Sequence, residues 1–259
     1  MNGKLMSELQ GKAALITGAS RGIGAAAARE MASQGARVVL AARSGDEIAA
    51  IAAEINDAGG DALAVTCDVS DYAAVAAAVA RCHSTFGAVD ILVNNAGVIE
   101  PIGPLAESDP ALWAAATDIN FKGIYNGLRA ALPVMLNQGG GAIVNVSSGA
   151  ATSVLEGWSQ YCASKAGAFS LTRCADLENR DKGIQIVGLS PGTVMTEMQV
   201  VIKASGINPV SQLDPSVHLA PEWAAKAIAW LCTKDAAEFA GTDVHLRDEA
   251  IRQRIGLIA

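Results

Sequence analysis

Three residues in the second half of the chain, Ser148, Tyr161 and Lys165, have the types and the spacing of an acid–base site. Tyr161 and Lys165 are four residues apart, so on a helix both side chains lie on one face. A cation beside a phenol stabilises the phenolate and lowers the tyrosine pKa from about 10 towards neutrality. Such a tyrosine can act as a general acid or base at physiological pH. Ser148 ends a strand-like run, and its hydroxyl could hydrogen-bond the same reacting oxygen.

Taken alone, a Tyr-x-x-x-Lys pair on an alanine-rich helix is more often a surface pair than a catalytic one. The elements around it therefore decide the interpretation. A glycine-rich turn near the N-terminus is the first of them. Gly18, Gly22 and Gly24 follow an apolar run at 12–17, and an alanine-rich helical stretch continues to about residue 34.

A glycine pattern between a strand and a helix is the context that phosphate binding requires. The glycines let the chain turn tightly. The helix N-terminus then offers free N–H groups and the positive end of its dipole to a pyrophosphate. The alternative is a tight turn in which the glycines serve packing alone.

Apolar runs and helical patterns alternate along the rest of the chain. Strands are expected at residues 12–17, 37–42, 61–68, 89–93, the run that ends in Ser147-Ser148, 184–190 and 242–246. Helices are expected at 46–58, 71–86, 110–138, 157–181 and 221–232. This alternation predicts a single α/β domain over 1–259, Rossmann-like and doubly wound, with a seven-stranded parallel sheet and helices on both faces. Its ligand should lie beyond the carboxyl ends of the strands.

Residues 197–220 read as an irregular, partly apolar segment. It is too long for an ordinary connection, so we expect it to form a lid over the substrate.

The motifs together resemble those of the short-chain dehydrogenase/reductase family. In that family a serine lies thirteen residues before the tyrosine, as Ser148 does here. The Gly-x-x-x-Gly-x-Gly spacing and the run Asn94-Asn95-Ala96-Gly97 are also similar to family motifs. The resemblance covers nearly the whole chain, and the motifs occur in the family's order.

The resemblance implies roles for four catalytic residues. Tyr161 would give a proton to a substrate carbonyl, and Ser148 would hydrogen-bond the same oxygen. Lys165 would lower the Tyr161 pKa and hold the nicotinamide ribose. Asn120 matches the family's catalytic asparagine, where a helix distortion lets the backbone carbonyl hold a water that links the lysine to solvent. Asn120 could instead be a satisfied amide of the core.

The resemblance also implies the cofactor contacts. Asp68 and Val69 would contact the adenine, and a Pro-Gly turn after the sixth strand would touch the nicotinamide. Thr196 would bond the carboxamide or the phosphates. The residues expected to bind the cofactor are Gly18, Ser20, Arg21, Gly22, Ile23, Gly24, Arg43, Asp68, Val69, Asn95, Ala96, Gly97, Tyr161, Lys165, Pro191, Gly192, Val194 and Thr196.

The end of the second strand predicts which nicotinamide cofactor binds. An acidic residue there would bond a ribose 2′-hydroxyl and repel a 2′-phosphate. This chain has Ala42 at that place, followed by Arg43, and Arg21 lies in the glycine turn. Two guanidinium groups suit a phosphate dianion. We therefore expect NADP(H), the alternative being that both arginines are solvated surface charges.

The expected walls of the substrate site are mostly apolar. They are Val98, Ile99, Val154, Leu155, Trp158, Thr193, Val194, Met195 and Met198. Residues 156–158 and 196–199 resemble the sepiapterin and benzil reductase branch, which reduces vicinal dicarbonyls. The main rival is a 3-oxoacyl-thioester reductase acting on an acyl carrier protein or CoA. A third reading, from another class, is a cofactor-binding regulator without turnover.

Composition excludes several other classes. A net charge of −7 argues against a nucleic-acid or anionic-membrane surface. Residues 1–9 show no apolar signal-peptide region, and no apolar run is long enough to span a bilayer, so we expect a cytoplasmic protein. Five cysteines without a Cys-x-x-Cys pair predict buried thiols, and three scattered histidines suggest no metal site.

Two further expectations concern partners. In the family, the helices at about 110–138 and 157–181 pair across two-fold axes, which implies a homodimer or homotetramer. The tail after the last strand departs from the family's Asp-Gly-Gly. Its apolar tip at 256–259 would dock on a neighbouring subunit or fray.

Overall fold

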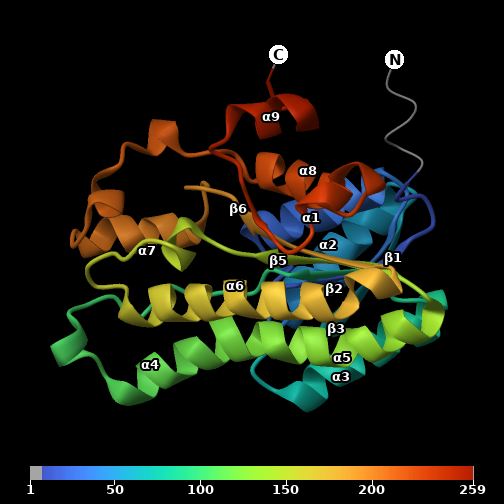
Figure 1. The fold of residues 1–259 in the computed structure, drawn as a ribbon, viewed down its shortest axis with the longest axis horizontal. Helices are drawn as coiled ribbons and strands as arrows, with labels where there is room; N and C mark the ends of the chain where they lie inside the picture. The colour runs from blue at the N-terminus through green and yellow to red at the C-terminus, as the bar shows by residue number, and fades with distance from the viewer. Residues whose placement is uncertain (1–7, 259) are drawn as a thin grey trace.

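The seven predicted strands form one parallel sheet in the computed structural model, which describes residues 8–258 (Figure 1). Residues 1–9, for which the sequence predicts no signal peptide, lie mostly outside the described part of the chain. The strands are β1 Ala13–Thr17, β2 Arg37–Ala42, β3 Asp61–Thr66, β4 Ile91–Asn94, β5 Gly141–Val146, β6 Ile184–Ser190 and β7 Asp243–His245. Their order is β3-β2-β1-β4-β5-β6-β7. The chain first adds strands on one side of β1 and then, from β4 onwards, on the other side, so the strand order reverses between β1 and β4. A cleft opens at such a switch point, beyond the carboxyl ends of the strands.

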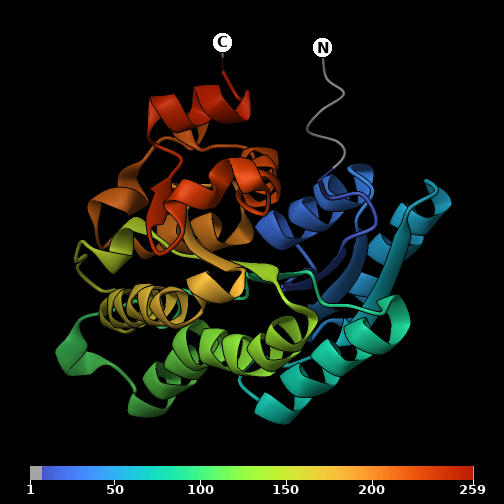
Figure 2. The same ribbon diagram turned by 45° about the vertical axis from the view of Figure 1, so that its right-hand side comes forward.

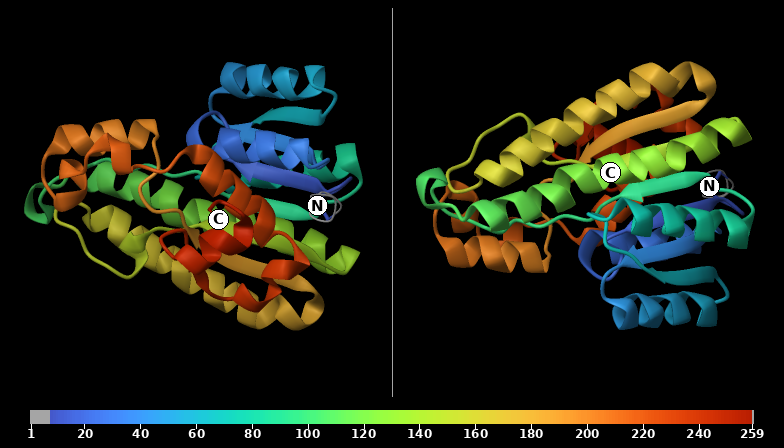
Figure 3. Two further views of the ribbon diagram at one scale, coloured as in Figure 1. Left: turned by 90° about the horizontal axis from the view of Figure 1, so that it is seen from above. Right: turned by 90° about the horizontal axis from the view of Figure 1, so that it is seen from below.

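Helices cover both faces of the sheet, as predicted (Figures 2 and 3). One apolar core lies under α1 Gly22–Ser33, α2 Gly45–Asp57 and α8 Pro221–Leu231. A second core lies under α3 Tyr72–Phe86, α5 Gly123–Gln138 and α6 Ser159–Asn179. The strands β1, β2, β4, β5 and β6 are buried on both faces, which explains why they read as continuous apolar runs rather than alternating ones. The edge strand β3 is half-buried or exposed along its length.

The helical stretch predicted at 110–138 is confirmed, with a distortion inside it. It consists of α4 Pro110–Thr117, a π-helical turn η3 Asp118–Lys122, and α5. Asp109 caps α4 by accepting hydrogen bonds from two backbone N–H groups, and Gly139 ends α5 in the left-handed conformation.

One prediction about the C-terminal third is wrong, and the tail has a structure that was not predicted. The segment 197–220 is not irregular, because it contains α7 Glu197–Ser205 and two 3-10 turns, η6 Pro209–Gln212 and η7 Pro215–Val217. The tail forms α9 Glu249–Ile255. Its Ile251 is buried, and Leu257 packs against the same core as α1 and α8. The described part of the tail therefore docks on its own chain (Figure 2).

The five cysteines are free thiols, but their burial differs from the expectation. Cys67, Cys82 and Cys162 are buried, Cys232 is half-buried and Cys174 is exposed. Burial raises the pKa of the Cys67 thiol to about 11 and that of the Cys82 thiol to about 12. No helix in the described part of the chain is long and apolar enough to cross a membrane.

Candidate active site

One cavity of about 1430 Å³ lies beyond the carboxyl ends of the central strands. It is larger than the roughly 300–1,000 Å³ typical of a drug-sized ligand site. All predicted catalytic and cofactor-binding residues line it except Gly24 and Asn120. The structure thus brings together residues that lie far apart in the sequence, from the glycine turn to the Pro-Gly turn.

The glycine turn fills the gap between β1 and α1 so tightly that side chains are excluded. A Cβ on Gly18, whose φ is +63°, would lie 2.7 Å from the Ala96 Cα. A Cβ on Gly24 would lie 2.3 Å from the Gly18 carbonyl oxygen. Gly24 therefore acts by letting the helix approach the turn, which explains its absence from the cavity wall.

Two helix N-termini at this cavity carry no side-chain cap. The N-cap residue of α1 is Arg21 and that of α2 is Ser44, and neither side chain accepts a hydrogen bond from its helix. Both N-cap residues line the cavity. Uncapped N–H groups together with the positive dipole end suit phosphate groups. The site thus fits a dinucleotide with phosphates near both helices.

The ends of β1 and β4 are held together by a side chain that the sequence analysis did not single out. The Thr17 hydroxyl donates to the Val93 carbonyl (3.2 Å) and accepts from the Asn95 backbone N–H (3.0 Å). The Asn95 amide donates in return to the Thr17 carbonyl (2.9 Å) and to the Gly18 carbonyl (3.1 Å). Asn95 therefore holds the glycine turn in place from the end of β4. A threonine at the end of the first strand is the only local signal for this contact.

Tyr161 and Lys165 lie on one face of α6, as their spacing predicts. Both are buried at the cavity wall, with 8% and 3% of their surface exposed. The Lys165 ammonium donates to the Val146 carbonyl (2.7 Å) and lies 5.6 Å from the centre of the Tyr161 ring. The Tyr161 ring packs edge-on against Trp158, at 5.6 Å between ring centres. Lys165 thus reaches the strand end that leads into Ser148.

The protonation of this pair differs from the expectation. Burial raises the pKa of Tyr161 above its usual 10, and a hydrogen bond with Ser148 only partly offsets this. Burial lowers the pKa of Lys165 to about 8, and the negative charge of Asp243 opposes that shift. Because its pKa is raised, the phenol is protonated at neutral pH. The Lys165 ammonium lies near the ring and donates to the Val146 carbonyl. The protonated phenol is the form that can give a proton to a carbonyl.

Asn120 occupies the middle of the π-helical turn η3 and is fully buried. Its side-chain amide donates to the Val98 carbonyl (2.8 Å) and accepts from the Val98 N–H (2.8 Å). The helix distortion that the resemblance implies is therefore present, and the side chain is also a satisfied amide. Single π-helical turns are frequent at functional sites. The water link through its backbone carbonyl stays a prediction.

Comparison with known proteins decides the family. The family model for short chain dehydrogenase matches residues 12–205. The chain belongs to this family. It is 40% identical to cis-4-hydroxycyclohexanecarboxylate dehydrogenase of Sinomonas cyclohexanicum, over 88% of this chain and 91% of that protein. It is 32% identical to the 3-oxoacyl-[acyl-carrier-protein] reductase FabG of Staphylococcus aureus, over 91% and 96%.

A solved structure is similar over nearly the whole fold. The crystal structure of levodione reductase superposes with a TM-score of 0.85 at 29% sequence identity, covering 92% of this chain and 96% of that one. As a short-chain dehydrogenase, the protein is an oxidoreductase of alcohol and carbonyl substrates that uses a nicotinamide cofactor.

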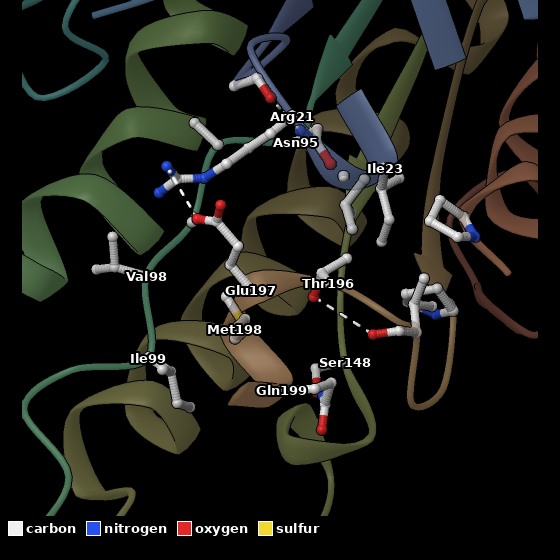
Figure 4. Close-up of a pocket in the computed structure, with 18 of the residues that line it drawn as sticks. Arg21, Ile23, Asn95, Val98, Ile99, Ser148, Thr196, Glu197, Met198 and Gln199 are labelled. Atoms are coloured by element: carbon white, nitrogen blue, oxygen red, sulfur yellow. Dashed lines mark hydrogen bonds and ion pairs between the residues drawn. The ribbon is translucent and has the colours of Figure 1, made fainter. Parts of the chain in front are cut away.

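The end of the cavity beside Ser148 and Tyr161 is mostly apolar. Eight of the nine predicted walls line the cavity, namely Val98, Ile99, Leu155, Trp158, Thr193, Val194, Met195 and Met198. Figure 4 shows Ile99, Met198 and Ser148 around the same space. Val154 was predicted wrongly, because it is 90% exposed and lines a separate hollow of about 730 Å³ beside Leu105.

The helix α7 supplies further walls that the sequence analysis missed. Val201 and Ile202 line the cavity, and Ile202 is buried against Trp158 and Tyr161 in one small apolar cluster. The segment is tied down beyond α7, where the Asn208 side chain donates to the Glu156 carbonyl (3.0 Å). The sequence signal that could have identified Val201 and Ile202 is the helical spacing of the apolar residues after residue 197.

Proposed function

We propose that the protein interconverts a carbonyl and a secondary alcohol by hydride transfer with NADP(H), using Ser148, Tyr161, Lys165 and Asn120. One observation carries this: the buried Tyr161–Lys165 pair and Ser148 line the same cavity as the glycine turn. The glycine turn and the Pro191-Gly192 turn would hold the cofactor, and the mostly apolar end of the cavity beside Tyr161 would then be left for the substrate. Family membership agrees with this chemistry.

The roles of the chain's own groups follow from their positions. Bound at the Pro191-Gly192 turn, the nicotinamide supplies the hydride in reduction and takes it in oxidation. The Tyr161 phenol donates its proton to the carbonyl oxygen, and the Ser148 hydroxyl hydrogen-bonds that oxygen. Lys165 as an ammonium stabilises the phenolate left behind and can hold the ribose. Positioning and preorganised charge supply most of the acceleration.

NADP(H) is the cofactor that the charges around the adenosine end favour. β2 ends at Ala42 without a carboxylate, and Arg43 and Ser44 follow on the cavity wall at the uncapped start of α2. Arg21 lies on the same wall but forms an ion pair with Glu197 (3.1 Å), and both side chains are largely exposed (Figure 4). A 2′-phosphate would compete with this carboxylate for Arg21. Exposed ion pairs are weak, so the competition costs little.

Arg43→Ala should therefore weaken NADPH binding about 10- to 100-fold and leave NADH binding almost unchanged. A hydrogen bond to a charged group contributes roughly 1.5–3 kcal/mol, which corresponds to that range. Fluorescence titration of both cofactors on the wild type and the variant measures the ratio. Arg81→Ala, which removes an exposed arginine of α3, is the charge-matched control. Equal losses for NADPH and NADH would show that Arg43 does not read the phosphate.

For the substrate we propose a small apolar dicarbonyl, as the sepiapterin and benzil reductase branch would use. The walls are mostly apolar, although Thr193 and Gln199 also line the cavity, and the structurally similar levodione reductase acts on a dione by its name. The similarity to a 3-oxoacyl reductase keeps a second candidate. A panel with a vicinal diketone and an acetoacetyl thioester separates the two. Turnover of the thioester alone would overturn the dicarbonyl proposal.

The proposed assembly is a homodimer or homotetramer through α5 and α6. Large apolar side chains are exposed on α4, α5 and α6, namely Leu112, Tyr125, Leu136 and Leu177. Their exposure agrees with a protein interface on these helices. Light scattering should therefore give at least twice the mass of 26.4 kDa. Leu177→Glu should shift the protein towards the monomer, and a monomeric wild type would contradict the proposal.

A further inference from the structure

A buried carboxylate lies behind the site, at the start of β7. The Asp243 side chain is 3% exposed. One of its oxygens accepts hydrogen bonds from the Ser147 hydroxyl (2.9 Å) and the Ser190 hydroxyl (2.8 Å). The other oxygen, Oδ1, is buried and has no partner among the described residues. A carboxylate is costly to bury, so its presence here calls for a compensating charge.

The two serines that bond Asp243 lie at the ends of the strands that carry the site. Ser147 stands between Val146, whose carbonyl accepts from the Lys165 ammonium, and Ser148. Ser190 is the last residue of β6 and immediately precedes the Pro-Gly turn. A single carboxylate thus joins the loop of the reacting serine to the turn expected to touch the nicotinamide.

We propose that Asp243 is a positioning residue for the reaction: its carboxylate fixes the ends of β5 and β6 and places a negative charge near the Lys165 ammonium. This inference rests on the proposed function, in which Lys165 must be charged to stabilise the phenolate. The two serine hydroxyls donate to one oxygen of Asp243, and hydrogen bonds of this kind favour the ionised form of a carboxyl group. The negative charge of Asp243 also acts on Lys165.

The titratable groups around Asp243 come from two elements. Burial raises the pKa of Asp243, and the serine donors, His245 and Lys165 act in the opposite direction. On β7, the imidazole of His245 lies 4.0 Å away. From α6, Lys165 acts on Asp243, and Tyr161 adjoins Lys165.

Further along α6, buried Asp176 lies beside Gly241, near the start of β7, and is paired with Arg180. Asp243 is the carboxylate that raises the pKa of Lys165 against the effect of burial.

The sign of the effect follows from this charge. With Asp243 ionised, the Lys165 ammonium persists up to about pH 8. Without that charge the ammonium is lost at lower pH, because an opposite charge nearby shifts a pKa by roughly 1–3 units. Asp243→Asn should therefore move the alkaline limb of the kcat profile about one to two pH units lower. Turnover should fall about tenfold at pH 8 and less than twofold at pH 6. A merely structural role would lower kcat by one factor at every pH.

A second readout does not need turnover. Only the neutral amine reacts with a small acylating reagent, so the pH at which Lys165 becomes modified, followed by mass spectrometry, reports its pKa. The midpoint should move to lower pH in Asp243→Asn. The control is Asp181→Asn, which removes an exposed carboxylate just before the start of β6, at the end of the strand away from the site. It should leave both readouts at wild-type values.

The outcomes separate this inference from the proposed function. A wild type without turnover on any carbonyl, together with a shifted Lys165 midpoint, would refute the function and keep the role of Asp243. If the alkaline limb of the kcat profile and the pH midpoint of Lys165 modification were both unchanged in Asp243→Asn, the inference would be overturned. Should Asp243→Asn not fold, Asp243→Ser removes the same charge with a smaller side chain and should shift both readouts in the same direction. An unshifted Asp243→Ser would then count against the inference.

Discussion

The kcat of Tyr161→Phe should be about 10²–10⁴-fold lower than that of the wild type, which is the range that a positioned acid or base contributes. The variant keeps the ring that packs edge-on against Trp158 and loses only the phenolic oxygen that bonds Ser148. No other described group at this place is a protonated acid held beside Ser148. NADPH affinity should stay within about twofold, since the hydroxyl is one of many cofactor contacts. Steady-state kinetics with the best substrate of the panel and a fluorescence titration of NADPH measure the two effects.

The matched control is Tyr125→Phe, which removes the hydroxyl of a half-exposed tyrosine on α5. Its turnover should equal that of the wild type. The experiment also tests the reading of a cofactor-binding regulator without catalysis. A biological activity that survived Tyr161→Phe in full would favour the regulator. Equal turnover of the two variants would remove Tyr161 from the mechanism.

Gly24→Ala should cost both stability and cofactor binding. The new methyl group would lie 2.3 Å from the Gly18 carbonyl oxygen and 2.5 Å from the Asn95 amide nitrogen. Neither group can yield easily, because the amide is bonded to the Thr17 and Gly18 carbonyls and the carbonyl is backbone. Overpacking of this kind lowers the free energy of unfolding by about 1–3 kcal/mol. Since the displaced turn is the expected phosphate site, NADPH binding should become undetectable at micromolar cofactor.

Urea denaturation and NADPH titration test this against Gly103→Ala. A Cβ on Gly103 meets no atom within 4 Å, so the control should stay within about 0.5 kcal/mol of the wild type. Wild-type stability and affinity in Gly24→Ala would show that the turn can rearrange around an added methyl group. The close packing of α1 on the turn would then not be a requirement of the site.

Much of the fold and of the site follows from local sequence pattern. The alternation of apolar runs with helical stretches predicted seven parallel strands covered on both faces, and the structure confirms them. The spacing of Tyr161 and Lys165 placed them on one helix face, because a helix repeats every 3.6 residues. The glycine turn between β1 and α1 was likewise readable, since its neighbours define its context.

Some elements were misread because their local signals were weak. α7 is short and follows a turn, so its apolar spacing looked irregular. The tail was expected to dock on a neighbouring subunit or to fray, but Ile251 has a place in the core beside α8 that only the folded chain provides. In both cases tertiary packing stabilises a helix that a short segment would not form alone.

The charges of the site were decided by tertiary structure alone. The Tyr161 phenol has a raised pKa and not a lowered one, because burial outweighs the hydrogen bond from Ser148. Ser147 and Asp243 are 96 residues apart in the chain and 2.9 Å apart in the fold. A pKa depends on burial and on charges a few ångströms away, and sequence spacing reports neither across such a separation. The sequence by itself determined which groups could react, and the packing of β5, β6 and β7 under α6 decided their protonation and their partners.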